Sequence, residues 1–160
     1  MATTFTLYNS FLKYIADGTI DLDADTIKVA LVTSSYTPDV KHDVLADVNA
    51  SPDPEVVAIA SPANGYTQGG AALSGKTVTL TDSPTPINTF DASDTTWSSL
   101  TATFRYGIVY SAKSVGSPAI VNPLIGYILF NDTPADISVS AVDFTIQWNA
   151  SGILTFSKSA

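Results

Sequence analysis

The chain has 160 residues, which is enough for one domain with its own hydrophobic core. It contains no cysteine, so disulfide bonds, thiolate metal sites and cysteine nucleophiles are excluded. Fifteen acidic residues against seven lysines and arginines give a net charge of −8. This balance argues against a nucleic-acid partner, because phosphate binding requires clustered basic side chains.

The N-terminal stretch MATTFTLYNS has neither a basic start nor a long apolar run, so we expect no secretory signal. No stretch of the sequence approaches the ~20 apolar residues of a membrane-spanning helix, so we expect no membrane partner.

The stretch Thr4–Asp17 is predicted to be the one helix of the chain. Gly18 stands where the residue after a helix often takes a left-handed conformation. We expect this helix to close one end of the molecule's own sheet, and the alternative is that it docks on a partner chain. Its apolar side chains recur at three- and four-residue spacing, at Leu7, Tyr8, Phe11, Leu12 and Ile15.

The segment Gly18–Asp25 carries three spaced aspartates and resembles half of a calcium loop. A complete EF-hand loop would require glycine in place of Thr26 and glutamate in place of Val32. We therefore predict a solvated turn and no metal site. The following stretch, Thr26–Thr33, has little polar interruption, which predicts a strand covered on both faces.

Residues 34–62 are rich in Asp, Pro and Ser and are predicted to form a long irregular loop. Val44–Val48 is expected to make a helical turn within it, and Glu55–Ile59 a short edge strand. The single histidine, His42, lies beside Asp43, but no motif supplies a nucleophile, so we expect an exposed histidine rather than a catalytic one.

The stretch Gly70–Thr77 matches the phosphate-binding pattern G-x-x-x-x-G-K-[ST]. A phosphate-binding loop needs a buried strand before it and a helix after it, because the helix N-terminus supplies the amides that hold the phosphates. Here Asn64–Gly70 reads as a turn, and Val78–Thr81 alternates in the manner of a strand. We therefore expect a glycine-rich loop that enters the strand Lys76–Asp82, and no nucleotide site.

The stretch Thr101–Ser111 is predicted to be a central strand, because it is rich in aromatic and β-branched residues. Two-residue spacing places four of its large side chains on one face. These side chains are Phe104, Tyr106, Ile108 and Tyr110.

Further strands are expected at Ile87–Phe90, Leu124–Phe130, Val142–Asn149 and Ile153–Ser157, with Thr95–Leu100 leading into the central strand and a loop at Ala112–Pro123. We predict that residues 101–157 form a meander of antiparallel strands, with Phe104, Tyr106, Phe144, Ile146 and Trp148 inside. Val142 lies on the same inner face of its strand as Phe144, because the strand alternates, and Asn149–Gly152 is predicted to be a hairpin-type connection. The predicted fold is a single mainly β domain over residues 1–160. It is an antiparallel β-sandwich or partly closed barrel with one short N-terminal helix.

The sequence contains one histidine and no G-x-S-x-G motif, so we expect no enzyme, no cofactor and no metal. Aromatic residues in or near loops are typical of interfaces. Arg105, the only arginine, is expected in a structural ion pair or in a contact on the outer face of the sheet. The predicted interface residues are Tyr36, Tyr66, Gln68, Trp97 and Arg105.

Five strings, taken in order, resemble a family of small virion proteins of tailed bacteriophages that decorate or cement the head. The strings are DADTIKVALVTSSYTPD, NGYTQGGAALSGKTVT, the TW…TFRYGIVY block, LIGYILF and DFTIQWNASGILTF. The resemblance covers most of the chain, from about Leu7 to Phe156.

The resemblance implies a non-catalytic protein on the outside of the capsid, bound to the major capsid protein and folded in the host cytoplasm. We expect a homo-oligomer with closed symmetry, a trimer in preference to a dimer. The alternatives are a tail or neck protein, or a carbohydrate-binding β-sandwich that stacks sugars on Tyr36, Tyr66 and Trp97.

Overall fold

The computed structural model describes residues 4–50, 54–55, 65–81, 86–131, 133 and 135–157. All pairings among the described strands are antiparallel, so the prediction of a mainly β, antiparallel fold is confirmed. The strands form separate sheets in a sandwich-like arrangement. The elements in chain order are β1 (Thr4–Leu7), α1 (Asn9–Ala16), β2 (Ile27–Val32), α2 (Leu45–Val48), β3 (Ala71–Ala72), β4 (Thr77–Thr81), β5 (Ile87–Asp91), β6 (Thr95–Phe104), β7 (Tyr106–Ser111), β8 (Ser114–Val115), β9 (Ile120–Val121), β10 (Leu124–Leu129), β11 (Ile137–Ile146) and β12 (Leu154–Ser157).

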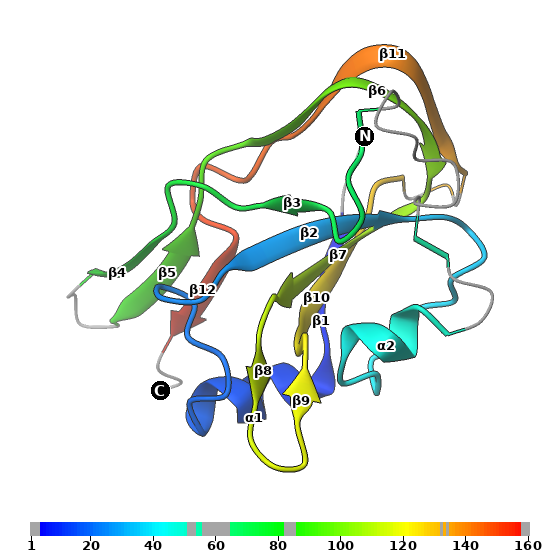
Figure 1. Ribbon diagram of the computed structural model, residues 1–160. Coiled ribbons are helices and arrows are strands. Elements are labelled where there is room, and N and C mark those ends of the chain that lie inside the picture. The colour runs from blue at the N-terminus through cyan, green and yellow to red at the C-terminus, as the bar shows by residue number, and fades with distance from the viewer. Residues whose placement is uncertain are drawn as a thin grey trace.

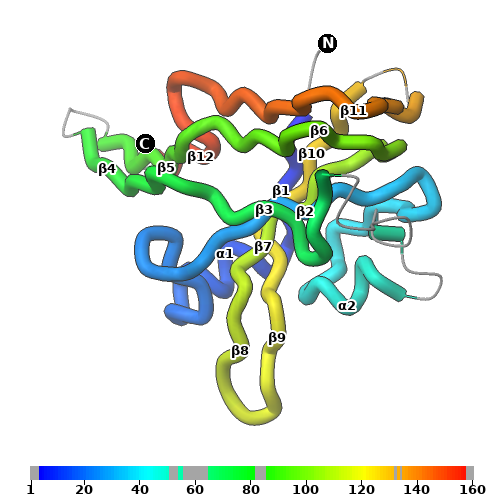
Figure 2. Tube along the Cα trace, turned by 45° about the horizontal axis from the view of Figure 1, so that its top comes forward, coloured from blue at the N-terminus to red at the C-terminus, as the bar shows by residue number. Residues whose placement is uncertain are grey.

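A five-stranded sheet lies at the centre of the molecule, in the order β1-β10-β7-β2-β3. The ribbon made by β6 and β11 arches over this sheet, and the three-stranded sheet β12-β5-β4 lies to one side (Figure 1). Helix α2 lies near the opposite end of β2 from the three-stranded sheet. The hairpin of β8 and β9 extends away from the rest of the molecule (Figure 2).

The central sheet has a core on both of its faces, as the apolar strand at residues 26–33 predicts. Along β2, Val29 and Leu31 belong to the larger cluster, under the ribbon and the three-stranded sheet. Ala30 and Val32 belong to the smaller cluster, on the side of α2. This alternation follows from the two-residue period of a strand, and it explains why β2 carries almost no polar residue.

The N-terminal prediction is wrong for its first turn. Residues Thr4–Leu7 form strand β1, which pairs with β10 from Thr4 opposite Leu129 to Leu7 opposite Gly126. The two threonines of this segment are β-branched, and pairing with β10 satisfies its backbone while Phe5 and Leu7 pack on the larger cluster. The helical spacing of apolar residues begins at Leu7, but pairing with β10 determines the structure of this segment.

Helix α1 is therefore shorter than predicted and packs on its own core. It buries Phe11 and Tyr14, whereas Leu12 is 60% exposed. The ring of Phe11 lies 6.3 Å from that of Phe156 in β12. Gly18 follows the helix with a φ of +75° and donates its amide to the carbonyl of Ile15, as predicted for a residue that ends a helix.

The predicted strand at residues 101–111 is broken at Arg105 into β6 and β7. Phe104 at the end of β6 belongs to the larger cluster, whereas Ile108 and Tyr110 belong to the smaller cluster on the other side of the sheet. At the break, the amide of Arg105 donates to the carbonyl of Val32, and its own carbonyl accepts from Phe130. Because of the break, the residues before Arg105 form a strand of the ribbon and those after it form a strand of the central sheet.

The predicted C-terminal meander over residues 101–157 does not form. Strand β10 pairs with β7, β11 pairs with β6, and β12 pairs with β5. The turn at Asn149–Gly152 exists, and Gly152 takes a φ of +99°, but it joins strands of two different sheets rather than a hairpin. Non-local pairing of this kind leaves no mark in the spacing of residues along the chain.

Strand β11 is irregular where the sequence alternates most clearly. Its register with β6 shifts between Val139 and Val142 and again before Phe144, and Ala141 has a φ of +51°. As a result Val142, predicted to point inward, is 49% exposed. Bulges turn a side chain to the other face without any change in the sequence pattern.

Two segments predicted as loops contain more structure. The helical turn within residues 34–62 is confirmed as α2, and Glu55 forms a β-bridge with Val32. The remainder of the edge strand predicted at Glu55–Ile59 lies outside the described residues. The predicted loop at Ala112–Pro123 contains the hairpin of β8 and β9.

Two glycines with positive φ give a matched test of the packing between β2 and β3. Gly70 has a φ of +70°, and a Cβ there would overlap the carbonyl oxygen of Val29, whereas Gly18 has open space around it. We expect Gly18→Ala to lower the free energy of unfolding by about 1 to 2 kcal/mol, the cost of a left-handed backbone. Gly70→Ala should cost about 3 kcal/mol or more, because the backbone must also move. Urea denaturation of both variants measures this, and equal losses would contradict the close approach at Gly70.

Candidate binding surfaces

Three of the five predicted interface residues are part of the core. The exposed fractions of Tyr36, Tyr66 and Trp97 are only 5%, 3% and 5%. The prediction that these rings stand on the surface is therefore wrong, and so is their use as sugar-stacking platforms. The physical reason is that burial of a large aromatic ring stabilises the fold by more free energy than it costs to order the segment that carries the ring.

Tyr66 fastens the segment before β3 to strand β2. Its hydroxyl donates to Oε1 of Glu55 at 2.8 Å and accepts from the amide of Leu31 at 3.0 Å. The same carboxylate oxygen accepts from the amide of Gly69 at 2.6 Å. Burial, followed by the charge of Glu55, raises the pKa of Tyr66 far above its usual range, so the hydroxyl remains a donor.

Trp97 is enclosed by other rings of the core. It stacks on Tyr66 with the ring centres 6.4 Å apart and contacts Phe144 at 6.0 Å. Its low exposure assigns it to the core.

Tyr36 takes part in a chain of hydrogen bonds under the smaller cluster. Its hydroxyl lies 2.9 Å from that of Tyr8 and 3.1 Å from Nδ1 of His42. His42 is half-buried, so the prediction of an exposed histidine is wrong. Tyr36 and His42 hold the segment before α2 against Tyr8, between β1 and α1, which is a structural role.

Arg105 and Gln68 lie nearer to solvent. The guanidinium Nε of Arg105 donates to Oδ1 of Asp136 at 2.8 Å, and Ser34 donates to the other carboxylate oxygen at 3.2 Å. The expected ion pair of Arg105 is therefore confirmed. Gln68 is exposed, on the turn that precedes Gly69.

The lysine of the phosphate-binding pattern holds the acidic turn together. The ammonium group of Lys76 donates to the backbone carbonyls of Leu22, Asp23 and Asp25, at 3.3, 2.8 and 2.5 Å. Thr77 begins strand β4, at the point where a phosphate-binding loop would begin its helix. With the ammonium group engaged and no helix N-terminus present at this point, Gly70–Thr77 lacks the geometry of a nucleotide site.

The acidic turn contains one carboxylate that is partly buried. Asp25 pairs with Lys113 at 2.7 Å and also accepts from the hydroxyl of Ser111 and the amide of Asp21. Burial acts to raise the pKa of Asp25, but the hydrogen bonds from Lys113, Asp21 and Ser111 outweigh it and lower the pKa. The three aspartates form no metal cluster; nor does any other group of His, Asp and Glu in the described part of the chain.

No helix among the described residues is long and apolar enough to cross a membrane.

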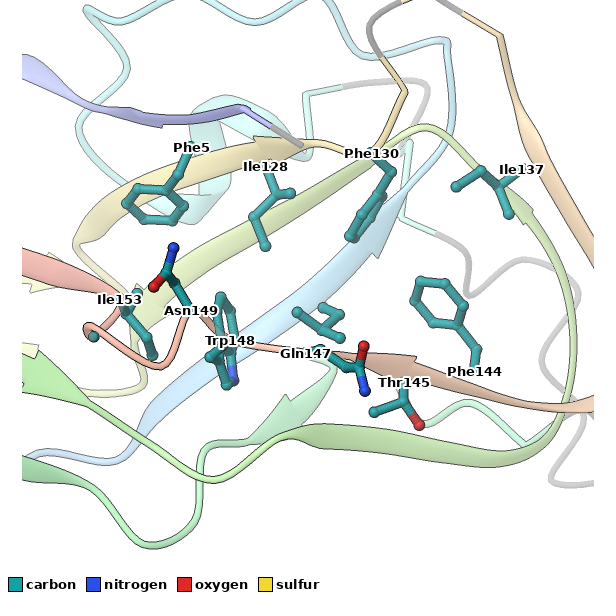
Figure 3. A pocket seen from close by; sticks show the side chains of 12 residues that line it. Phe5, Ile128, Phe130, Ile137, Phe144, Thr145, Gln147, Trp148, Asn149 and Ile153 are labelled. Atoms are coloured by element: carbon teal, nitrogen blue, oxygen red, sulfur yellow. The ribbon is translucent and has the colours of Figure 1, made fainter. Parts of the chain in front are cut away.

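A groove of about 850 Å³ opens between the edge of the central sheet and the end of β11. Figure 3 shows Phe5, Ile128 and Phe130 directed into it from one side and Phe144 and Trp148 lying opposite. None of its lining side chains can ionise. The full lining is Phe5, Ile128, Phe130, Ile137, Phe144, Thr145, Ile146, Gln147, Trp148, Asn149, Gly152 and Ile153.

A second exposed apolar surface is strand β4 at the end of the three-stranded sheet. Its side chains Val78 and Leu80 are 46% and 60% exposed. Sequence reasoning predicted this strand but not its exposure, and it missed the groove. One signal for β4 was available, since each apolar residue in Thr77–Thr81 is flanked by threonines, a composition typical of an edge.

Comparisons with protein-family models, with curated proteins and with solved structures found no match.

The partly buried ion pair of Asp25 and Lys113 gives a test of what fixes the acidic turn. We expect Asp25→Asn to lower the free energy of unfolding at pH 7 by about 1 to 3 kcal/mol, because Lys113 loses a charged acceptor. The folded pKa of Asp25 is lowered, so its contribution is present above the ordinary carboxyl pKa and is lost as the pH falls through the folded value. The difference between wild type and variant should therefore shrink in acid.

Thermal denaturation between pH 7 and pH 2 measures this difference. The matched control is Asp17→Asn, which removes the exposed ion pair with Lys13 and should cost much less. Equal losses at both positions, or a difference that grows in acid, would contradict the assignment.

Proposed function

We propose that this chain is a non-catalytic structural protein of a tailed-bacteriophage virion, which binds the outer surface of the head and cements it. The observation that carries the proposal is the uncharged apolar groove beside β1 and β11. The order of sequence strings that resembles the head-decoration proteins supports the same role.

The chemistry of the groove suits binding rather than catalysis. General acid–base catalysis needs a titratable group near the reacting atoms, and the lining residues offer hydroxyl and amide groups together with apolar surface. Such a lining can take up an apolar segment of a partner while Gln147 and Asn149 bond to its backbone. The partner we propose is the major capsid protein.

The charge of the chain fits a place on the outside of the head. A protein of net charge −8 is repelled by the packaged DNA, so the outer face of the shell is the favourable side. We propose no nucleic-acid or membrane partner and no cofactor. Without cysteine, the chain can fold in the reducing host cytoplasm before it joins the virion.

Because the capsid subunit is repeated over the shell, binding at each single groove does not need to be tight. A homo-oligomer that engages several capsid subunits gains from each later contact, which is effectively intramolecular. A modest groove contact is therefore sufficient for stable decoration.

The proposal predicts that the purified protein co-sediments with heads of the encoding phage that were assembled without it, and that it raises their melting temperature. We expect Gln147→Arg to weaken this binding about tenfold or more, because it places a charge in an uncharged groove. The matched control is Ser140→Arg, an exposed position of β11 outside the groove lining, which should bind as the wild type does.

Failure of the wild type to bind such heads would overturn the proposal, and its recovery with isolated tails or necks would favour the alternative virion role. Equal loss in both arginine variants would show that the groove is not the contact.

A further inference from the structure

Strand β4 is an open edge with both faces in solvent. It ends the sheet order β12-β5-β4, and among the described strands it pairs with β5 alone. All five of its residues are exposed. Figure 2 shows β4 and β5 at one extremity of the molecule, away from the central sheet.

One face of β4 continues the core of the molecule without a cover. Val78 lies opposite Phe90 of β5, which lies opposite Leu154 of β12. Phe90 and Leu154 are buried in the larger cluster, while Val78 and Leu80, on the same face of the sheet, are exposed. The apolar face of this sheet therefore continues from β12 and β5 onto β4, but the core of the chain covers it only at β12 and β5.

We propose that β4 pairs edge to edge with β4 of a second copy of this chain, in antiparallel orientation around a two-fold axis at Thr79. The inference does not depend on the proposed function. It also changes the expected symmetry, because an isologous strand pair closes as a dimer and not as a trimer.

The sequence of β4 is complementary to itself in this register. It reads Thr-Val-Thr-Leu-Thr, so Val78 comes opposite Leu80 of the other copy, and Thr79 comes opposite itself. The apolar face then carries four adjoining aliphatic side chains, and the other face carries pairs of threonines. Both kinds of cross-strand pair are favourable in antiparallel sheets.

Charge favours a second copy at this edge in particular. Two chains that each carry a net charge of −8 repel, so a self-contact needs a stretch without acidic side chains, and Thr77–Thr81 has none. Lys76, which precedes the strand, donates to the carbonyls of Leu22, Asp23 and Asp25, so the contact rests on the uncharged strand itself.

The contact is small, and this sets the expected affinity. A five-residue edge pair with four aliphatic side chains falls below the ~1,000 Å² of a stable interface, so the dimer should dissociate in the range of about 10 to 100 μM.

Single cysteines test the register, since the native chain has none. In Thr79→Cys the two thiols face each other across the axis, within reach of a disulfide. In Thr77→Cys the two thiols are about 13 Å apart, because each is opposite residue 81 of the other copy. We expect mild oxidation with glutathione disulfide to convert most of the Thr79→Cys protein into a covalent dimer and little of the Thr77→Cys protein. Equal cross-linking of both variants, or none in Thr79→Cys, would overturn the register.

Sedimentation velocity tests the contact itself, on the protein alone and without heads. Leu80→Lys should weaken dimerisation about tenfold or more. The control is Leu12→Lys, which changes the same residue type at the same exposed fraction of 60% and should leave the dimer unchanged. A wild type that remains monomeric at several hundred micromolar, or that forms a trimer, would overturn the proposal. Equal losses in the two lysine variants would do so as well.

Discussion

Burial of the central sheet on both faces is the constraint on which the rest of the structure depends. Strands β2, β7 and β10 are almost wholly apolar, so each face needs its own cover. The ribbon of β6 and β11, the three-stranded sheet and α1 enclose the larger cluster, and the segment that carries α2 covers the smaller one. The break at Arg105 follows from this need, because one segment supplies both a covering strand and a central one.

Buried and partly buried polar groups fasten the connecting segments to this sheet. Glu55 and Tyr66 fix the approach to β3, and Lys76 and Asp25 close the acidic turn. A charge that is removed from water needs hydrogen-bonding partners, and each of these groups has them. Residues that resemble nucleotide-binding or calcium-binding fragments in the sequence therefore have structural roles in the fold.

Much of the fold could be predicted from local pattern, since β2, β4, β5 and β10 all lie where alternation or apolar runs place them. The strand pairings could not, because contacts such as β12 with β5 depend on distant segments. Two local sequence patterns also predicted the wrong structure. The helical spacing at Leu7 gave way to pairing with β10, and the alternation at Val142 was displaced by a bulge.

The interface was the least predictable feature. Aromatic rings in loops suggested surface contacts, but Tyr36, Tyr66 and Trp97 gain more from burial. Two apolar surfaces that are open among the described residues are an uncharged groove assembled from β1, β10 and β11, and the threonine-flanked edge of β4. The groove combines residues more than a hundred positions apart, so only the folded chain reveals it.

We propose a contact at each of these two surfaces. The groove suits a partner segment, and the edge suits a second copy. A cryo-EM density map of the virion that contains this chain tests that account most directly. The account predicts density for the chain on the outer surface of the head, with the groove facing a capsid subunit. Density confined to the tail or neck, or a groove that faces solvent on the head, would contradict it.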